Sequence, residues 1–147
     1  QGREEMALGS LLAGMSFSAA GTAAVHALQY PVGEATHTSH GLGNAVLMPT
    51  VMKHIVHARI PEMAFIARAL DAGLRTASDE AAAEQAPELV ARLGDKVGIP
   101  RGLAKIGMKR EQLAEMADLA FSVKRLLDNS PVAFDRDKLM GLLEEAF

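Results

Sequence analysis

The chain contains no cysteine, no tryptophan and a single tyrosine among its 147 residues. Without cysteine there are no disulfide bonds and no thiolate metal ligands, so nitrogen and oxygen atoms must supply any metal site. No run reaches the roughly 18 consecutive apolar residues of a membrane-spanning helix, and the first residues do not resemble a signal peptide. We therefore expect a soluble, cytoplasmic protein with no membrane partner.

The chain also has no large excess of acidic or basic residues. The net charge is −3, and the lysines and arginines are spread along the sequence. Such a chain has no basic surface for phosphate backbones, which argues against a nucleic-acid partner. Hydrophobic residues make up 49% of the chain, which is enough for one hydrophobic core. A chain of 147 residues is too short to suggest two domains. The sequence predicts one domain over residues 1–147.

Helical patterns account for nearly all of the chain, and strand patterns are almost absent. The first helix is expected over Glu4–His26, beginning inside a helix of a longer polypeptide because no capping residue precedes it. Its many small residues predict close packing inside a bundle, with Leu8, Leu11, Leu12 and Met15 among the apolar contacts. Pro31 is expected to end this helical stretch and to open a loop that runs to Ser39.

The remaining sequence predicts further helices with recognisable starts and stops. Capping residues, prolines and glycines set their bounds. The expected elements are a helix from Thr38 or Ser39 to Ile55 bent at Pro49, a helix over Glu62–Asp71 behind Pro61, a helix capped by Ser78 and divided by Pro87 with Leu89, Val90, Leu93 and Val97 as its apolar face, a helix over Lys109–Asp128, and a last helix capped by Asp135. The expected fold class is all-α, a bundle of roughly six to eight helices.

All five histidines lie within 32 residues of one another. His54 and His57 lie near a helix end, where a structural or solvent role is expected, and His37 lies in the predicted loop. His26 and His40 differ, because one closes the small-residue helix and the other opens the next, so both can point into one cavity. Imidazole suits Fe²⁺ and Zn²⁺, but a catalytic site commonly takes three protein ligands, so this pair is half of a site.

The segments Gly21–Gly33 and His40–Pro49 resemble the signature of the iron-containing (group III) alcohol dehydrogenases. The resemblance extends over the whole chain and implies the C-terminal helical domain of that family. It implies that His26 and His40 are two of four metal ligands, the others being an Asp and a His on an earlier helix that this chain does not include. The family's N-terminal α/β domain, which binds NAD(P), is likewise outside this chain.

The function that this resemblance implies is hydride transfer between an alcohol or carbonyl substrate and NAD(P), with a divalent metal, Fe²⁺ or Zn²⁺, polarising the substrate oxygen. Many members carry a second histidine where this chain has Tyr30, so Tyr30 is a candidate for the substrate pocket. Many also carry proline where Ser39 stands. No catalytic acid or base is assigned from the sequence, and the isolated chain is expected to bind metal weakly, to bind no nicotinamide nucleotide and to be inactive.

Two other interpretations stay open. The chain can be a non-catalytic helical assembly domain that keeps the family fold, or its metal can be zinc, as in glycerol dehydrogenase-like relatives on a similar scaffold. Apolar helix faces that lose their partner domain predict exposed patches and a homo-oligomer. Gly41-Leu-Gly43-Asn44 lacks the strand and third glycine of a dinucleotide-binding turn, so its glycines are interpreted as close packing near the metal.

Overall fold

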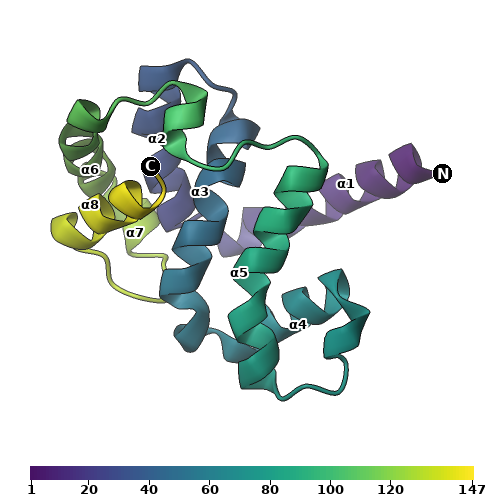
Figure 1. Cartoon of the computed structure of the whole chain (residues 1–147). Coiled ribbons are helices and arrows are strands. Elements are labelled where there is room, and N and C mark those ends of the chain that lie inside the picture. The colour runs from purple at the N-terminus through teal and green to yellow at the C-terminus, as the bar shows by residue number, and fades with distance from the viewer.

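The computed structural model describes residues 1–147 and is entirely helical, with no strand (Figure 1). This confirms the predicted all-α class and the predicted number of helices. Four short 3₁₀ segments, Val56–Ala58, Ala72–Leu74, Leu103–Ile106 and Arg110–Gln112, connect the main elements. The eight α-helices are α1 (Gly2–Ala20), α2 (Ala24–Thr36), α3 (His40–Ile55), α4 (Ile60–Leu70), α5 (Asp79–Lys96), α6 (Leu113–Ser122), α7 (Lys124–Leu127) and α8 (Arg136–Glu145).

The core has two parts, and α3 contributes to both. The larger part is built by α2, α3, α6, α7 and α8, with Leu28, Leu47 and Leu142 fully buried. The smaller part joins the end of α3 to α4 and α5 through Met52 and Ala64. Burial of a whole leucine side chain stabilises a fold by about 1.5–3 kcal/mol, so α3 is held firmly along its length.

The expected break at Pro31 is wrong, because α2 continues through it to Thr36. Leu28 and Val32, on either side of this proline, are fully buried. A proline inside a helix costs about 3 kcal/mol through its missing hydrogen bond and its ring, and burial of neighbouring side chains offsets such a cost. Pro87 likewise lies buried inside an undivided α5, and α3 passes through Pro49 without a break.

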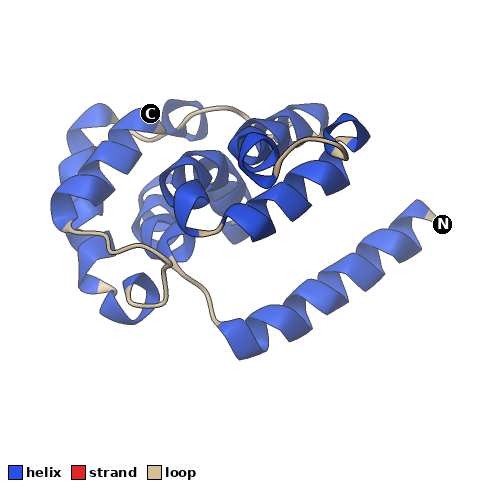
Figure 2. Ribbon diagram, turned by 90° about the horizontal axis from the view of Figure 1, so that it is seen from below, coloured by secondary structure: helices blue, strands red, loops and turns tan.

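The expected burial of the first helix is also wrong. The predicted helix Glu4–His26 is two helices, separated at Gly21, whose φ of 77° is in the left-handed region that glycine favours. No residue of α1 is buried, and Leu12 keeps 56% of its surface exposed. Figure 2 shows α1 extending away from the other helices. Most of its apolar side chains are more than half exposed, among them Met6, Leu8, Leu11, Leu12 and Met15.

Local capping signals predicted the helix starts well. The Ser78 side chain accepts a hydrogen bond from the Ala81 N–H, and the Asp135 side chain accepts one from the Lys138 N–H, as the sequence predicts for α5 and α8. Pro61 lies in the first turn of α4.

Two predicted details of the later helices are corrected. The predicted helix Lys109–Asp128 is interrupted at Val123, which separates α6 from α7. The buried face of α5 is formed by Ala82, Ala83, Ala86 and Pro87, whereas the predicted face residues Leu93 and Val97 are exposed. These alanines pack against Met63 and Ala64 of α4, and Leu89 and Val90 of the predicted face are partly buried against the same cluster.

No single helix is long and apolar enough to cross a membrane; α1 and α2 together pass that test of length and composition, but they are bent by 109° relative to each other.

Candidate metal centre

His26 and His40 come together because α2 and α3 are joined by a tight turn. His26 lies in the first turn of α2, and His40 is the first residue of α3. His37, in the left-handed region with φ of 54°, ends α2 and lets the chain reverse. The His26 and His40 ring centres lie 5.0 Å apart, with an angle of 51° between the ring planes.

This separation fits two imidazoles that share one ion. In a tetrahedral site with metal–nitrogen distances of about 2.0–2.1 Å, two coordinating imidazole rings have centres about 5 Å apart. The donor set is neutral nitrogen, which Fe²⁺ and Zn²⁺ both accept. The chain itself contains no group of three or more His, Cys, Asp or Glu side chains that could hold a metal ion. The two histidines are therefore a partial ligand set.

Hydrogen bonds assign the tautomer of His40. The Asn44 amide Nδ2 lies 3.0 Å from His40 Nε2 and 2.9 Å from the His40 carbonyl oxygen. Since an amide nitrogen donates, Nε2 must accept and the ring proton must be on Nδ1. Nδ1–H then donates to Gln29 Oε1, 2.6 Å away. This is the neutral form with an Nε2 lone pair, the form that coordinates metals.

His26 favours the same charge state for a different reason. Its ring is half-buried on α2, and the pKa of His26 is lowered below its ordinary value of 6.5, first by burial and then by the nearby His40. Burial penalises the charged form of a histidine. Burial therefore favours the neutral, metal-binding form of His26.

Tyr30 lies one turn after His26 on α2, with its ring centre 6.5 Å from that of His26 and 6.0 Å from that of His40. It is 45% exposed. Tyr30 thus lies beside the histidine pair, and its place in a substrate pocket stays a prediction.

A cavity of about 270 Å³ lies on another side of His26. Phe17 of α1 and Met48, Val51 and Ile55 of α3 give it an apolar lining, and Tyr30 is not among its residues. The sequence did not predict this cavity, because Phe17 and the α3 residues are 31 or more positions apart. Asn129 fixes the approach of α1 by donating to the carbonyl oxygen of Ala20 at 2.9 Å.

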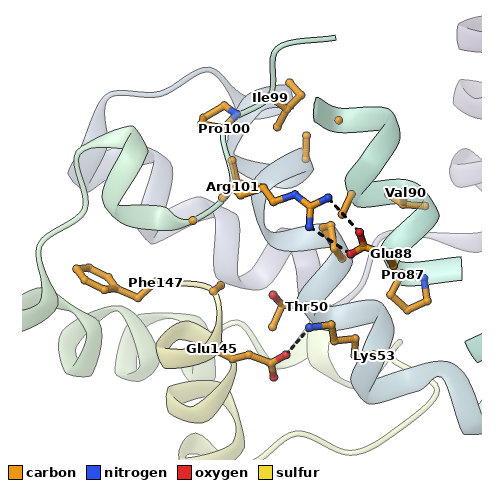
Figure 3. A pocket seen from close by; sticks show the side chains of 17 residues that line it. Thr50, Lys53, Pro87, Glu88, Val90, Ile99, Pro100, Arg101, Glu145 and Phe147 are labelled. Carbon is orange, nitrogen blue, oxygen red and sulfur yellow. Dashed lines mark hydrogen bonds and ion pairs between the residues drawn. The ribbon is translucent and has the colours of Figure 1, made fainter. Parts of the chain in front are cut away.

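A second cavity, of about 300 Å³, lies between α3, α5 and the C-terminus and contains none of the candidate residues (Figure 3). Its positively charged side chains form salt bridges. Arg101 pairs with Asp95 at 2.6 Å and with Glu88 at 3.2 Å, and Lys53 pairs with Glu145 at 3.0 Å. These pairs leave no unpaired cation there for the phosphates of a nucleotide.

The other histidines stay apart from the pair. His54 Nε2 bonds Glu145 Oε2 at 2.8 Å, and this contact, followed by that of Lys53, lowers the pKa of Glu145. His37 and His57 are exposed. All three lie on the surface.

The glycines of the Gly41–Asn44 segment have different roles. A Cβ on Gly43 would lie 2.9 Å from Gln29 Cγ, so this glycine allows close packing beside the histidine pair, as expected. A Cβ on Gly41 would meet nothing within 4 Å, so the same expectation is wrong for Gly41.

Gln29 is the residue of this site that the sequence analysis missed. A single glutamine forms no pattern. The one available signal was the glycine four residues later, Gly33, which falls in the predicted loop from Pro31 to Ser39 although it lies inside α2.

Comparison with known proteins gives concordant matches. The profile of a family described as "Fe-containing alcohol dehydrogenase family, C-terminal" matches residues 1–147. Long-chain-alcohol dehydrogenase 1 of Geobacillus thermodenitrificans is 39% identical over 147 residues, 100% of this chain and 37% of that protein. NAD-dependent methanol dehydrogenase of Bacillus methanolicus is 34% identical over 137 residues, 93% of this chain and 36% of that protein.

A crystal structure of a 1,3-propanediol oxidoreductase superposes on the chain with a TM-score of 0.92 and 32% sequence identity, covering 99% of this chain and 38% of that one. The chain thus spans a little over a third of the length of the relatives that it matches.

Proposed function

This chain belongs to the Fe-containing alcohol dehydrogenase family, and from this premise we propose that it is the helical, metal-binding part of an oxidoreductase that transfers hydride between an alcohol or carbonyl compound and NAD(P). The observation that carries the proposal is the pair of neutral imidazoles, 5.0 Å apart, presented by two different helices. We propose residues 1–147 as one α-helical domain whose ligand set is completed by residues outside this chain.

In this proposal His26 and His40 hold a divalent ion, Fe²⁺ or Zn²⁺, through their ring nitrogens. When bound, such an ion acts as a Lewis acid toward the substrate oxygen and lowers the pKa of an alcohol. The protein residues supply the rest: burial keeps His26 uncharged, and hydrogen bonds keep the His40 proton on Nδ1. The first effect favours ligation over protonation of His26, and the second leaves Nε2 of His40 without a proton.

The two sides of the histidine pair suit different parts of a small substrate. The cavity beside His26 has a mainly apolar lining, which suits an alkyl group. Tyr30, on the open side, offers a hydroxyl to a polar substituent or to the nicotinamide. We propose that the nucleotide is bound by a part of the protein outside this chain; the name of the NAD-dependent relative supports a nicotinamide cofactor. We further propose a cytoplasmic enzyme, which the absence of cysteine fits.

A second candidate function is a non-catalytic assembly domain. The exposed apolar side chains of α1, such as Leu11 and Met15 at 60% and 64% exposure, favour association with another surface, including a second copy of the chain. An assembly domain has no need of the histidine pair, so metal binding separates the two candidates.

The test is calorimetric titration of the chain with Zn²⁺ at pH 7.5, beside the variants His26→Ala and His40→Ala. We expect one site in the unaltered chain and at least tenfold weaker binding in each variant. The matched control is His57→Gln, an exposed histidine outside the pair, which should bind as the unaltered chain does. Circular dichroism of each variant checks that the helices are retained.

Binding that is absent in the unaltered chain, or unchanged in both alanine variants, would overturn the metal site and favour the assembly domain. Binding that falls equally in the His57→Gln variant would point to nonspecific imidazole coordination at the surface, and it would also count against the proposal.

A further inference from the structure

Gln29 has an unusual position for a glutamine. It is 4% exposed, and the one other buried polar residue of the structure, Thr50, is 8% exposed. Burying an amide without hydrogen bonds costs roughly 1–3 kcal/mol by protein mutational data. A buried glutamine on α2 therefore needs a partner, and its carbonyl oxygen has one in His40.

Two helices leave room for this side chain by carrying glycine. A Cβ on Gly33 of α2 would lie 2.5 Å from Gln29 Nε2, and one on Gly43 of α3 would lie 2.9 Å from Gln29 Cγ. Real Cβ atoms do not approach so closely, so any other residue at either position would displace the amide. Glycine inside a helix costs about 0.5–1 kcal/mol relative to alanine. At these two positions the absence of a Cβ atom leaves the space that the Gln29 side chain occupies.

The fixed amide in turn fixes a ring that is otherwise exposed. His40 begins α3 and faces solvent, and a free imidazole exchanges between two tautomers and two ring orientations. Gln29 Oε1 accepts the Nδ1 hydrogen at 2.6 Å, while Asn44 donates to Nε2 on the opposite edge of the ring. Contacts at both nitrogens leave one tautomer and one orientation.

We propose that Gln29 is a positioning residue that keeps His40 Nε2 unprotonated, so that a metal ion can take the place of the Asn44 N–H that Nε2 accepts in this structure. The inference rests on the proposed function, because it assigns a task to Gln29 within the same site. Outer partners of metal-binding histidines fix the tautomer and orientation of the ring, and their loss typically weakens metal binding 10–100-fold. Gln29 itself need not touch the metal or the substrate.

Two substitutions of similar length separate the hydrogen bond from the packing. Gln29→Met fills the same space but accepts no comparable hydrogen bond, whereas Gln29→Glu keeps an oxygen acceptor toward Nδ1. The matched control is Thr50→Val, which removes the other buried polar side chain, ten residues from His40 on α3. Each protein is studied as the full 147-residue chain.

The first readout is independent of metal: ¹⁵N chemical shifts of the His40 ring nitrogens at pH 8, where imidazoles are neutral. We expect the Nδ1–H tautomer in the unaltered chain, in Gln29→Glu and in Thr50→Val. In Gln29→Met we expect a partial shift toward the Nε2–H tautomer, because only the Asn44 contact then favours Nδ1–H. The second readout is Zn²⁺ affinity by calorimetry, expected to fall about 10–100-fold in Gln29→Met and to be largely retained in Gln29→Glu.

The outcomes discriminate between the inference and the proposed function. Unchanged tautomer and Zn²⁺ affinity in Gln29→Met would overturn the role of Gln29 while leaving the metal site intact. A mixture of tautomers in the unaltered chain would overturn it even if Gln29→Met failed to fold. If the unaltered chain bound no Zn²⁺ but only Gln29→Met lost the Nδ1–H tautomer, the proposed function would fail and the hold of Gln29 on His40 would stand.

Discussion

Replacing Gly43 by alanine tests whether the packing around Gln29 is as close as the structure indicates. The new methyl group would lie 2.9 Å from Gln29 Cγ and 3.2 Å from its Nε2. The first contact is with a carbon near the backbone, which cannot move aside as the end of a flexible side chain can. Both α2 and α3 are buried at this point, so relief requires a shift of one helix or a new rotamer of Gln29.

Two opposing terms set the magnitude. Alanine is favoured over glycine inside a helix by about 0.5–1 kcal/mol. Overpacking of a well-filled interior typically costs about 1–3 kcal/mol. The difference predicts that Gly43→Ala lowers the free energy of unfolding by about 1 kcal/mol, and by no more than about 2.5 kcal/mol. The control is Gly41→Ala, two residues earlier in α3, where a Cβ meets nothing within 4 Å. This control should leave stability unchanged or raise it by up to about 1 kcal/mol.

The assay is urea unfolding followed by circular dichroism at 25 °C, without added metal. The predicted result is opposite changes in the unfolding midpoint for two identical substitutions in one helix. Equal stabilisation by both would show that Gln29 has room to move, and it would remove the packing argument for its fixed position. A mixed His40 tautomer in Gly43→Ala would link the packing directly to the histidine.

Three further predictions test other parts of the structure. In a ¹H NMR titration the pKa of His26 should lie below 6.5. The contribution of His26 to stability is then present above pH 6.5 and is lost as the pH falls through the lowered pKa. His40→Gln should raise the pKa of His26 only part of the way, because burial is the larger cause, and an unchanged pKa would exclude the coupling between the two histidines. Leu47→Ala, at a fully buried core position, should lower the free energy of unfolding by about 2–5 kcal/mol. Leu12→Ala on α1, where the leucine is 56% exposed, should change it by less than about 0.5 kcal/mol. An equal loss of stability in both variants would show that α1 is packed against another surface in solution. Asp135→Ala removes the cap of α8 and should cost about 0.5–2 kcal/mol in the same urea assay, a loss that Asp135→Asn should largely avoid.

Features decided within a few residues were predictable from the sequence. The caps Ser78 and Asp135 are examples, because each side chain bonds a backbone N–H three residues further along. Features decided by distant residues were not. Pro31 lacks the hydrogen-bond donor that an unbroken helix requires, yet α2 continues because Leu28 and Val32 are buried against other helices. No local rule contains that contact.

The first helix shows the same limit from the opposite side. Its leucines and methionines indicate a buried helix, and an apolar pattern does indicate that a partner surface exists. The pattern does not say whether the partner lies in the same 147 residues. Here α1 has no buried residue, so the prediction of burial was wrong for this chain, although the pattern on which it rested is real.

The candidate site combines both cases. His26 and His40 are separated by 14 residues, and the Pro/Gly-containing segment between them suggested that they face one another. The partner of His40 could not be foreseen, because the amide of Gln29 reaches it only when α2 runs on through Pro31 and brings Gly33 beside α3. Had the helix ended before Pro31, as local propensity predicts, Gly33 would lie in a loop and the amide would lose one of the two backbones that enclose it. The same burial that overrides the proline therefore holds Gln29 in place, and through Gln29 it sets which nitrogen of His40 carries the proton.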